Sequence, residues 1–201
     1  MSFVLASKNL NNKIMKNIII LFIVIISLSI RSLAQSVFKA NIEKSKFSWT
    51  GYASVGNYAP TGTIKLSSGI LNFDGLKISK AIFEFDMKML IHDNKDLQNH
   101  LRNQDFFDVE KYPKATFILE KINENQATGL LKIKDVQKKI TFPITIKKLE
   151  KEIQIQANIS INRTDFGIKY NSTSFFSNLG DYAVKDNFEF RLDLSMDKLI
   201  N

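Results

Sequence analysis

Residues 100–117 read HLRNQDFFDVEKYPKATF, and the interpretation of the remaining chain starts from this stretch. It joins a helical segment, a polar turn and the beginning of a strand, because apolar residues four apart share a helix face and Pro113 ends any helix. Phe106 and Phe107 stand next to each other between aspartates, which is a poor composition for a surface loop. The pattern predicts a plug or lid on a β-structure, with at least one phenylalanine inserted into apolar space.

On both sides of this stretch, apolar and polar residues alternate with the period of a β-strand. In residues 152–162, apolar side chains at the odd positions oppose polar side chains at the even positions. One buried and one solvated face in each strand is typical of antiparallel sheet. Similar runs cover residues 46–50, 61–73, 78–89, 115–122, 127–134, 139–147 and 188–194.

This pattern predicts a single all-β domain of about eight strands, with a helical insertion near residues 94–104 and an irregular segment at 163–185. Turn residues occur at 67–69, 74–75, 123–125 and 134–135. Alternation alone leaves open whether the sheet forms a sandwich or closes into a barrel. A barrel would have no free edges, and an eight-stranded barrel is just wide enough for one slender ligand.

The composition excludes several classes of protein. The 201 residues are 44% hydrophobic and include 16 Phe, which suffices for a real core. Cysteine is absent, and this excludes disulfides, thiolate metal sites, a cysteine nucleophile and a lipid-modified cysteine anchor. The net charge of +8 falls to +4 after residue 34, where 24 basic and 20 acidic residues remain. That charge is too small to predict a nucleic-acid partner.

The N-terminal residues have the pattern of a secretory signal peptide. A basic start precedes an apolar run at 18–30, and Ser32 and Ala34 are the small residues expected before a cleavage site. A membrane anchor is the alternative, but a span needs about 20 apolar residues and an arginine ends this run early. We expect an upstream extension at 1–14, a signal peptide at 15–34 cleaved near Ala34, and a periplasmic or secreted domain at 35–201. Whether Met1 or Met15 starts the protein stays open.

The inward positions of the predicted strands are rich in aromatic residues and methionine. A packed core is the simpler interpretation, and an apolar cavity lined by adaptable side chains is the functional one. Alternation does not distinguish a filled interior from an empty one. The candidate ligand-binding residues, including those of the lid, are Trp49, Phe83, Phe85, Met87, Met89, Arg102, Phe106, Phe107, Phe117, Phe142, Phe188 and Phe190.

One histidine cluster has both a metal-binding and a structural interpretation. His92, Asp96 and His100 are spaced four and four apart and would share a face of one continuous helix, as a zinc or iron site requires. However, Asp93-Asn94 looks like a helix N-cap, which would place His92 before the helix begins. Surface histidines near a cap are then the alternative to a metal site.

Other charged groups also have two interpretations. Arg102 with nearby aspartates serves either an ion-pair network or a ligand head group, and Arg163 and Asp165 are candidates for the same end of the barrel. Lysines between residues 132 and 151 either keep strand faces soluble or attract an anionic membrane surface. No nucleophile triad, phosphate-binding glycine loop or zinc-protease motif is found, so no enzymatic activity is predicted.

The stretch at 100–117 closely resembles the HLRSxDFFDVxKYPxxxF-like core of the YceI-like family of secreted polyisoprenoid-binding proteins. Further agreement, in order, is found in FSWTG at 47–51, KITFP at 139–143, NRTDFGI at 162–168 and VKD at 184–186. Asp135 departs from the family pattern, which usually has Gly there. The similarity spans about residues 38–196.

The resemblance implies an extended, lipocalin-like, eight-stranded antiparallel barrel that holds a long isoprenoid chain, such as a quinone tail or a polyprenyl lipid. It implies no catalytic activity and no cofactor apart from the bound lipid. Two alternatives stay open: a metal-binding protein or enzyme that uses His92, Asp96 and His100, and a filled barrel that acts through its surface in envelope stress. The ligand, the pathway and the oligomeric state, with a homodimer among the options, are not determined by the sequence.

Overall fold

The computed structural model describes residues 35–199, which form ten β-strands, one α-helix and two short 3-10 helices. The predicted upstream extension and signal peptide lie outside the described residues. The strands are β1 Ser36–Ala40, β2 Lys46–Thr50, β3 Thr61–Phe73, β4 Ile78–Ile91, β5 Lys114–Asn123, β6 Gln126–Ile133, β7 Val136–Pro143, β8 Thr145–Lys148, β9 Glu152–Asn162 and β10 Asn187–Lys198. The helices are α2 Lys95–Arg102, η1 Arg163–Phe166 and η2 Gly180–Tyr182. No helix within the described range is long and apolar enough to cross a membrane.

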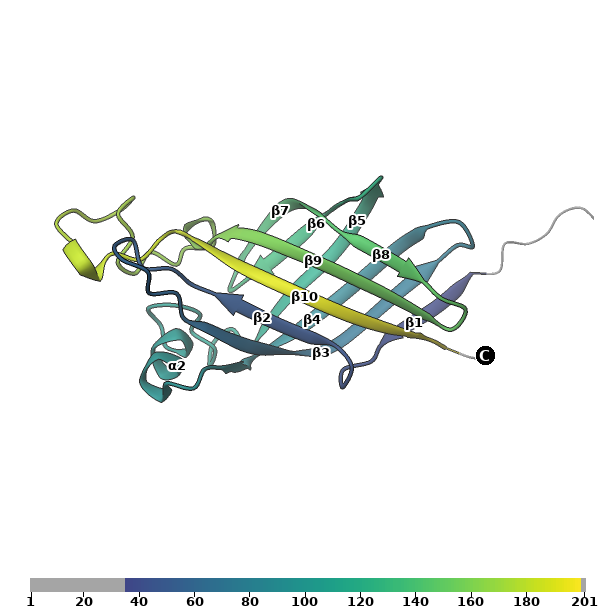
Figure 1. Ribbon diagram of the computed structural model, residues 1–201, viewed down its shortest axis with the longest axis horizontal. Helices are drawn as coiled ribbons and strands as arrows, with labels where there is room; N and C mark the ends of the chain where they lie inside the picture. The colour runs from purple at the N-terminus through teal and green to yellow at the C-terminus, as the bar shows by residue number, and fades with distance from the viewer. Residues whose placement is uncertain (1–34, 200–201) are drawn as a thin grey trace, which may run out of the picture. The chain divides into compact units, whose positions relative to one another are not determined.

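All strands belong to one antiparallel sheet with the order β7-β6-β5-β4-β3-β1-β10-β9-β8. β2 pairs with the same two strands as β1, namely β3 and β10. β1 and β2 therefore fill one strand position of the sheet, one after the other along its length. In the same way, β7 pairs with β6 and β8 pairs with β9, and only Ile144 separates β7 from β8. The sheet therefore returns to its first strand and forms a barrel with eight strand positions (Figure 1).

The predicted eight-stranded barrel is confirmed, and the two additional strands come from breaks within two of its positions. Between β1 and β2 the chain turns at Asn41, which accepts hydrogen bonds from the backbone N–H groups of Lys44 and Ser45. Between β7 and β8, Pro143 has no N–H for a ladder, and Ile144 N donates to Asn125 O at 2.8 Å. Both breaks follow from local chemistry and leave the barrel intact.

The alternation in the sequence corresponds to burial in most of the barrel, as in β9, where every second residue from Ile153 to Ile161 is buried. Two places differ from the prediction. The turn predicted at 67–69 is wrong, because β3 continues through it with a register shift against β4 between Leu66 and Ser68. In β4 the inward face also changes, since Met87 and Leu90 are both buried and Met89 is only half-buried.

The two ends of the barrel differ in how they are closed. At one end, Phe38, Leu71, Ile153 and Met196 are almost completely buried and fill the interior. At the other end, α2 and the long loops after β2 and β9 cover the opening (Figure 1). As predicted, Asn94 caps α2, and its side-chain oxygen accepts hydrogen bonds from Asp96 N and Leu97 N. The covered end is where space remains inside.

Candidate functional site

A cavity of about 540 Å³ occupies the covered end of the barrel. Strand residues such as Trp49, Ile64, Met87 and Phe188 form its wall, and the loops at 51–60 and 170–185 form its rim. A volume of this size is within the range of sites that bind small organic molecules. The hypothesis of a filled barrel predicts no such space, so the cavity argues against it.

A second cavity of about 90 Å³ lies deeper in the barrel. Its wall consists of aliphatic and aromatic side chains, including Phe83, Phe117, Phe142 and Ile155. Together, the two cavities place apolar space along the barrel axis, where a long apolar chain would be shielded from water.

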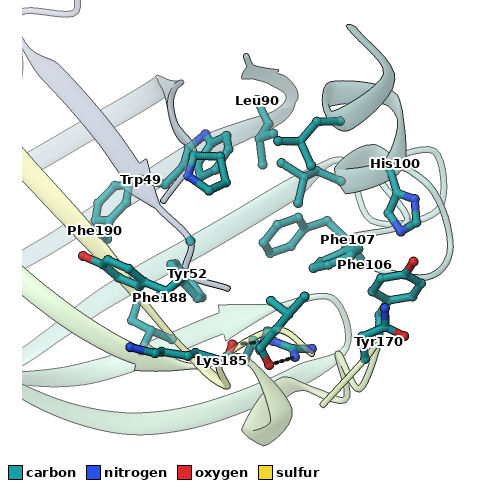
Figure 2. Close-up of a pocket in the computed structure, with 18 of the residues that line it drawn as sticks. Trp49, Tyr52, Leu90, His100, Phe106, Phe107, Tyr170, Lys185, Phe188 and Phe190 are labelled. Atoms are coloured by element: carbon teal, nitrogen blue, oxygen red, sulfur yellow. Dashed lines mark hydrogen bonds between the residues drawn. The ribbon is translucent and has the colours of Figure 1, made fainter. Parts of the chain in front are cut away.

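The stretch that the sequence singled out forms one side of the first cavity. His100, Leu101, Phe106 and Phe107 all line it, and Figure 2 shows both phenylalanine rings directed into the cavity. Phe106 is 8% exposed, whereas Phe107 is half-buried. The sequence left open which of the two faces inward, and in the structure both do.

Aromatic contacts attach this stretch to the opposite rim. The ring of Tyr170 lies 4.5 Å from the ring of His100 and 5.2 Å from the ring of Phe106, measured between centroids. His100 and Phe106 also meet edge to face at 5.3 Å. Such pairs contribute about 0.5–1.5 kcal/mol each beyond the burial of their area. The lid and the loop after η1 are therefore held together by one aromatic cluster (Figure 2).

Arg163 holds the rim loop at 170–185 in place. Its side chain is 4% exposed and donates three hydrogen bonds to backbone carbonyls, from Nε to Lys185 O at 3.1 Å, from Nη1 to Ile168 O at 3.0 Å and from Nη2 to Val184 O at 3.0 Å. A guanidinium has its donors in a fixed fork, which suits this arrangement. Nη2 also lies 3.5 Å from the carboxylate of Asp186. Arg163 therefore joins the two ends of the segment at 168–185, which contains one of the two rim loops.

Asp186 completes this network from the other side. Burial would raise the pKa of its carboxyl group, but hydrogen bonds from Ser172 and Ser174 and the charge of Arg163 lower the pKa below its usual value. The hydroxyl of Ser174 donates to Asp186 Oδ2 at 2.5 Å. Asp165, which was expected with Arg163 at the same end of the barrel as Arg102, is exposed, and the carboxylate beside Arg163 is that of Asp186.

Two ring nitrogens on the cavity wall are buried and have no hydrogen-bond partner within the described chain: Trp49 Nε1 and His100 Nε2. An indole N–H can only donate, whereas the imidazole nitrogen donates or accepts according to its tautomer. Most buried polar atoms in proteins have a partner, so these two nitrogens are exceptions within the described chain.

The predicted binding residues fall into three groups. Those on the first cavity are Trp49, Phe85, Met87, Phe106, Phe107, Phe188 and Phe190. Those on the second are Phe83, Phe85, Phe117, Phe142 and Phe190. Met89 and Arg102 line neither cavity. Leu90 takes the place of Met89 on the wall of the first cavity because the inward face of β4 changes. Arg102 donates a hydrogen bond from Nε to Leu90 O at 3.0 Å and so braces α2 against β4.

The rim residues were missed by the sequence reasoning. Tyr52, Tyr58, Tyr170 and Tyr182 line the cavity from segments without any alternation. The one available signal was the concentration of tyrosines just outside the predicted strands, where an amphipathic ring has one apolar and one solvated side.

The structure does not bring His92, Asp96 and His100 together as a metal site. His92 precedes the helix, and its Nδ1 accepts a hydrogen bond from Asn94 N at 2.9 Å. Across residues 35–199, His, Cys, Asp and Glu form no group of three that could hold a metal ion. His100 instead belongs to the aromatic cluster of the cavity wall.

Three of the lysines between 132 and 151 make contacts in different parts of the barrel. Lys134 Nζ donates to Phe106 O at 3.2 Å, beside the lid. Lys139 forms an ion pair with Glu120 at 2.7 Å on the outer face. Lys148 lies 3.8 Å from the ring centroid of Phe73, at the filled end. These contacts support the structural interpretation of three of the lysines.

Comparison with known proteins agrees with this geometry. The sequence pattern of the YceI-like domain family matches residues 38–196. A UPF0312 protein of Staphylococcus epidermidis is 31% identical over 115 residues, a match that covers 54% of this chain and 66% of that protein. A UPF0312 protein of Staphylococcus aureus is 26% identical over 117 residues, covering 55% of this chain and 67% of that protein. The match to the first thus spans just under two thirds of its length.

Solved structures show the same barrel. BcnA of Burkholderia cenocepacia superposes with a TM-score of 0.64 at 22% identity and covers 78% of this chain and 98% of its own. A polyisoprenoid-binding domain from Saccharophagus degradans superposes with a TM-score of 0.63 at 12% identity, covering 83% and 99%. The YceI protein of Campylobacter jejuni reaches 0.58 at 24% identity, covering 75% and 90%. At these identities the likeness concerns the fold.

Proposed function

This chain belongs to the YceI-like domain family, and on that premise we propose that it binds an isoprenoid-type lipid, a quinone or a polyprenyl compound, inside the barrel and carries it unchanged. The observation that carries the proposal is the apolar cavity of about 540 Å³ at the covered end. The S. degradans neighbour, described as a polyisoprenoid-binding domain, supports the ligand class at the level of the family.

An apolar cavity is sufficient for such binding. Each methylene group that moves from water into an apolar site contributes ~0.8 kcal/mol before the costs of association and chain ordering. The wall offers aromatic rings and a methionine, Met87, which adapt to a flexible chain. The buried guanidinium of Arg163 is already engaged by backbone carbonyls. A wall of this kind supports binding without chemistry.

The unpartnered nitrogens suggest where the polar head of the lipid would lie. Trp49 Nε1 is a donor and His100 Nε2 is a donor in one tautomer, and both belong to the wall of the first cavity. Both nitrogens are buried, so a neutral oxygen, such as a quinone carbonyl or a prenyl hydroxyl, would satisfy either of them once its ring turns toward the cavity. We therefore place the head group in the first cavity and the tail along the barrel axis.

The proposal includes the place where the protein works. The predicted signal peptide supports a periplasmic or secreted carrier that collects its ligand at a membrane surface. The rim carries exposed aromatic side chains: Tyr58, Phe175, Phe176 and Tyr182 are 62%, 48%, 51% and 80% exposed. Aromatic residues favour the boundary between lipid and water. Contact through this rim would let an insoluble tail pass into the cavity without crossing water.

Mass spectrometry of the domain at 35–201, purified without detergent, tests the binding proposal. Native and organic-extracted samples of the wild type are compared with Met87→Lys, which places a charge on the cavity wall, and with Met89→Lys, which makes the same change two residues away and off both cavities. We expect an isoprenoid-type lipid in the wild type and in Met89→Lys, and its loss in folded Met87→Lys.

Two results would contradict the proposal. One is a ligand-free wild type that stays empty after incubation with quinones and polyprenyl lipids. The other is equal retention of lipid by Met87→Lys and by the wild type, because a charge placed among apolar side chains must disfavour an apolar chain. Circular dichroism on both variants confirms that the barrel is folded.

A further inference from the structure

The two cavities follow one another along the barrel, strand by strand. In β4, Met87 lines the first cavity, Phe85 lines both and Phe83 lines the second. In β10, the same sequence of positions is Phe188, Phe190 and Leu192. Residues two apart on a strand face the same side of the sheet. In β4 and in β10, one residue therefore lines both cavities, between a residue that lines the first and a residue that lines the second.

The shared residues come from four different strands. They are Phe85 of β4, Leu131 of β6, Ile161 of β9 and Phe190 of β10, and together we name them the constriction. Each of them lines both cavities, so the constriction lies between two chambers of a single interior.

Aromatic packing holds the constriction closed. The rings of Phe85 and Phe190 meet edge to face at 5.5 Å between centroids. Phe47 contacts both, at 5.1 Å from Phe85 and 6.1 Å from Phe190. Phe190 is half-buried, and Figure 2 shows its ring at the end of the cavity away from Phe106 and Tyr170. An apolar tail that enters from the rim therefore meets this trio of rings.

The volume of each chamber limits how many heavy atoms of a lipid tail it can hold. At the ~30 Å³ that a water-sized group occupies in a liquid, the first chamber of about 540 Å³ holds about 18 heavy atoms, and the second, of about 90 Å³, holds about three more. Farnesol has about 16 heavy atoms and geranylgeraniol about 21, so the first fits above the constriction and the second needs both chambers.

We propose that the constriction determines the length of tail that the protein holds, with about three isoprene units above it and further length gained only where the two chambers are joined. This inference rests on the proposed function, since it concerns the tail of the same ligand. It assigns to Phe85 and Phe190 a role in chain-length selection, beyond their role as apolar wall.

The test compares the affinities of farnesol and geranylgeraniol. Trp49 is the one tryptophan of the chain and lines the first chamber, so its fluorescence reports binding directly. Phe85→Leu removes a ring from the constriction, and Phe190→Leu does the same at a half-buried position should the first variant fold poorly. Phe73→Leu is the matched control, because Phe73 is 8% exposed, close to the 9% of Phe85, and lines neither chamber.

We expect the wild type and Phe73→Leu to bind geranylgeraniol about tenfold more tightly than farnesol, because the first chamber has room for about two groups beyond those of farnesol. In Phe85→Leu or Phe190→Leu, this ratio should rise by a further factor of about fifty, because about three more groups enter the deeper chamber. An unchanged ratio in both variants, or a ratio of about five hundred already in the wild type, would overturn the inference while the proposed function stands. Failure of the wild type to bind either alcohol would instead overturn the proposed function, and the inference with it.

Discussion

Replacement of Arg163 by methionine should unfold the rim segment and destabilise the whole barrel. The substitution keeps an unbranched stem as long as arginine's from Cβ to Nε and removes the charge, the three hydrogen bonds to backbone carbonyls and the contact with Asp186. Hydrogen bonds to charged groups contribute about 1.5–3 kcal/mol each, and a buried methionine recovers part of that sum as apolar burial. Removal of one partner from a buried ion pair typically costs about 3–5 kcal/mol, and we expect a loss in this range.

Urea unfolding followed by circular dichroism measures this loss directly. For a domain of this size, 1 kcal/mol corresponds to about 2–4 °C, so Tm should fall by about 6–20 °C. Arg191→Met is the control, because the Arg191 side chain is 68% exposed and its pairing with Asp193 at 3.7 Å should contribute less than about 1 kcal/mol. If Arg163→Met stayed within about 1 kcal/mol of Arg191→Met, the buried network would not hold the rim, and the reasoning would be refuted.

Two further predictions concern the rim. The folded pKa of Asp186 lies below its unfolded value, so the ionised carboxylate stabilises the fold above an unfolded pKa of about 3.9, and this stabilisation is lost as the pH falls through the folded pKa. Asp186→Asn should therefore lower Tm at neutral pH and flatten the acid side of a Tm–pH profile, and an unaltered profile would contradict this. The double variant Phe175→Ser, Phe176→Ser should reduce the fraction of protein that sediments with lipid vesicles. Leu76→Ser should not, because Leu76 is 77% exposed but lies in the turn between β3 and β4, away from the rim, and equal losses would argue against contact through the rim.

The sequence predicts the barrel well because its information is local and periodic. The period-2 pattern of residues 152–162 determines which side chains of β9 face inward, and burial follows it residue by residue. The cap of α2 is also local, since a side chain of Asn94 that bonds to Asp96 N and Leu97 N needs no distant partner. Strands and caps are therefore readable without knowledge of the fold.

The binding site is less predictable because distant segments build it. Met89 has the same spacing as Met87 and Phe85, but β4 changes its inward face near its end, where its register against β3 shifts, and Leu90 takes the place on the wall. The sequence marks Arg163 as a candidate at this end of the barrel, but its role is recognisable only once the carbonyls of residues 168, 184 and 185 converge on it. The constriction likewise depends on which residues of four strands line both cavities, which alternation does not encode.

The stretch at 100–117 is a fixed wall rather than a moving lid, and this determines where a ligand enters. Its backbone is densely bonded: Phe107 N donates to Leu101 O at 3.2 Å, Asp108 N to Asn103 O at 2.7 Å and Val109 N to Arg102 O at 2.9 Å. Segments with many internal backbone bonds and buried side chains open rarely, whereas exposed loops open readily. The rim loops expose Tyr58 and Tyr182 to solvent at the same end of the barrel. Two backbone hydrogen bonds join the rim loops, from Ser54 N to Ala183 O at 2.8 Å and from Lys185 N to Tyr52 O at 2.9 Å. These are fewer than the bonds within the wall, so the rim, and not the helical stretch, is the physically cheaper entrance for an apolar chain.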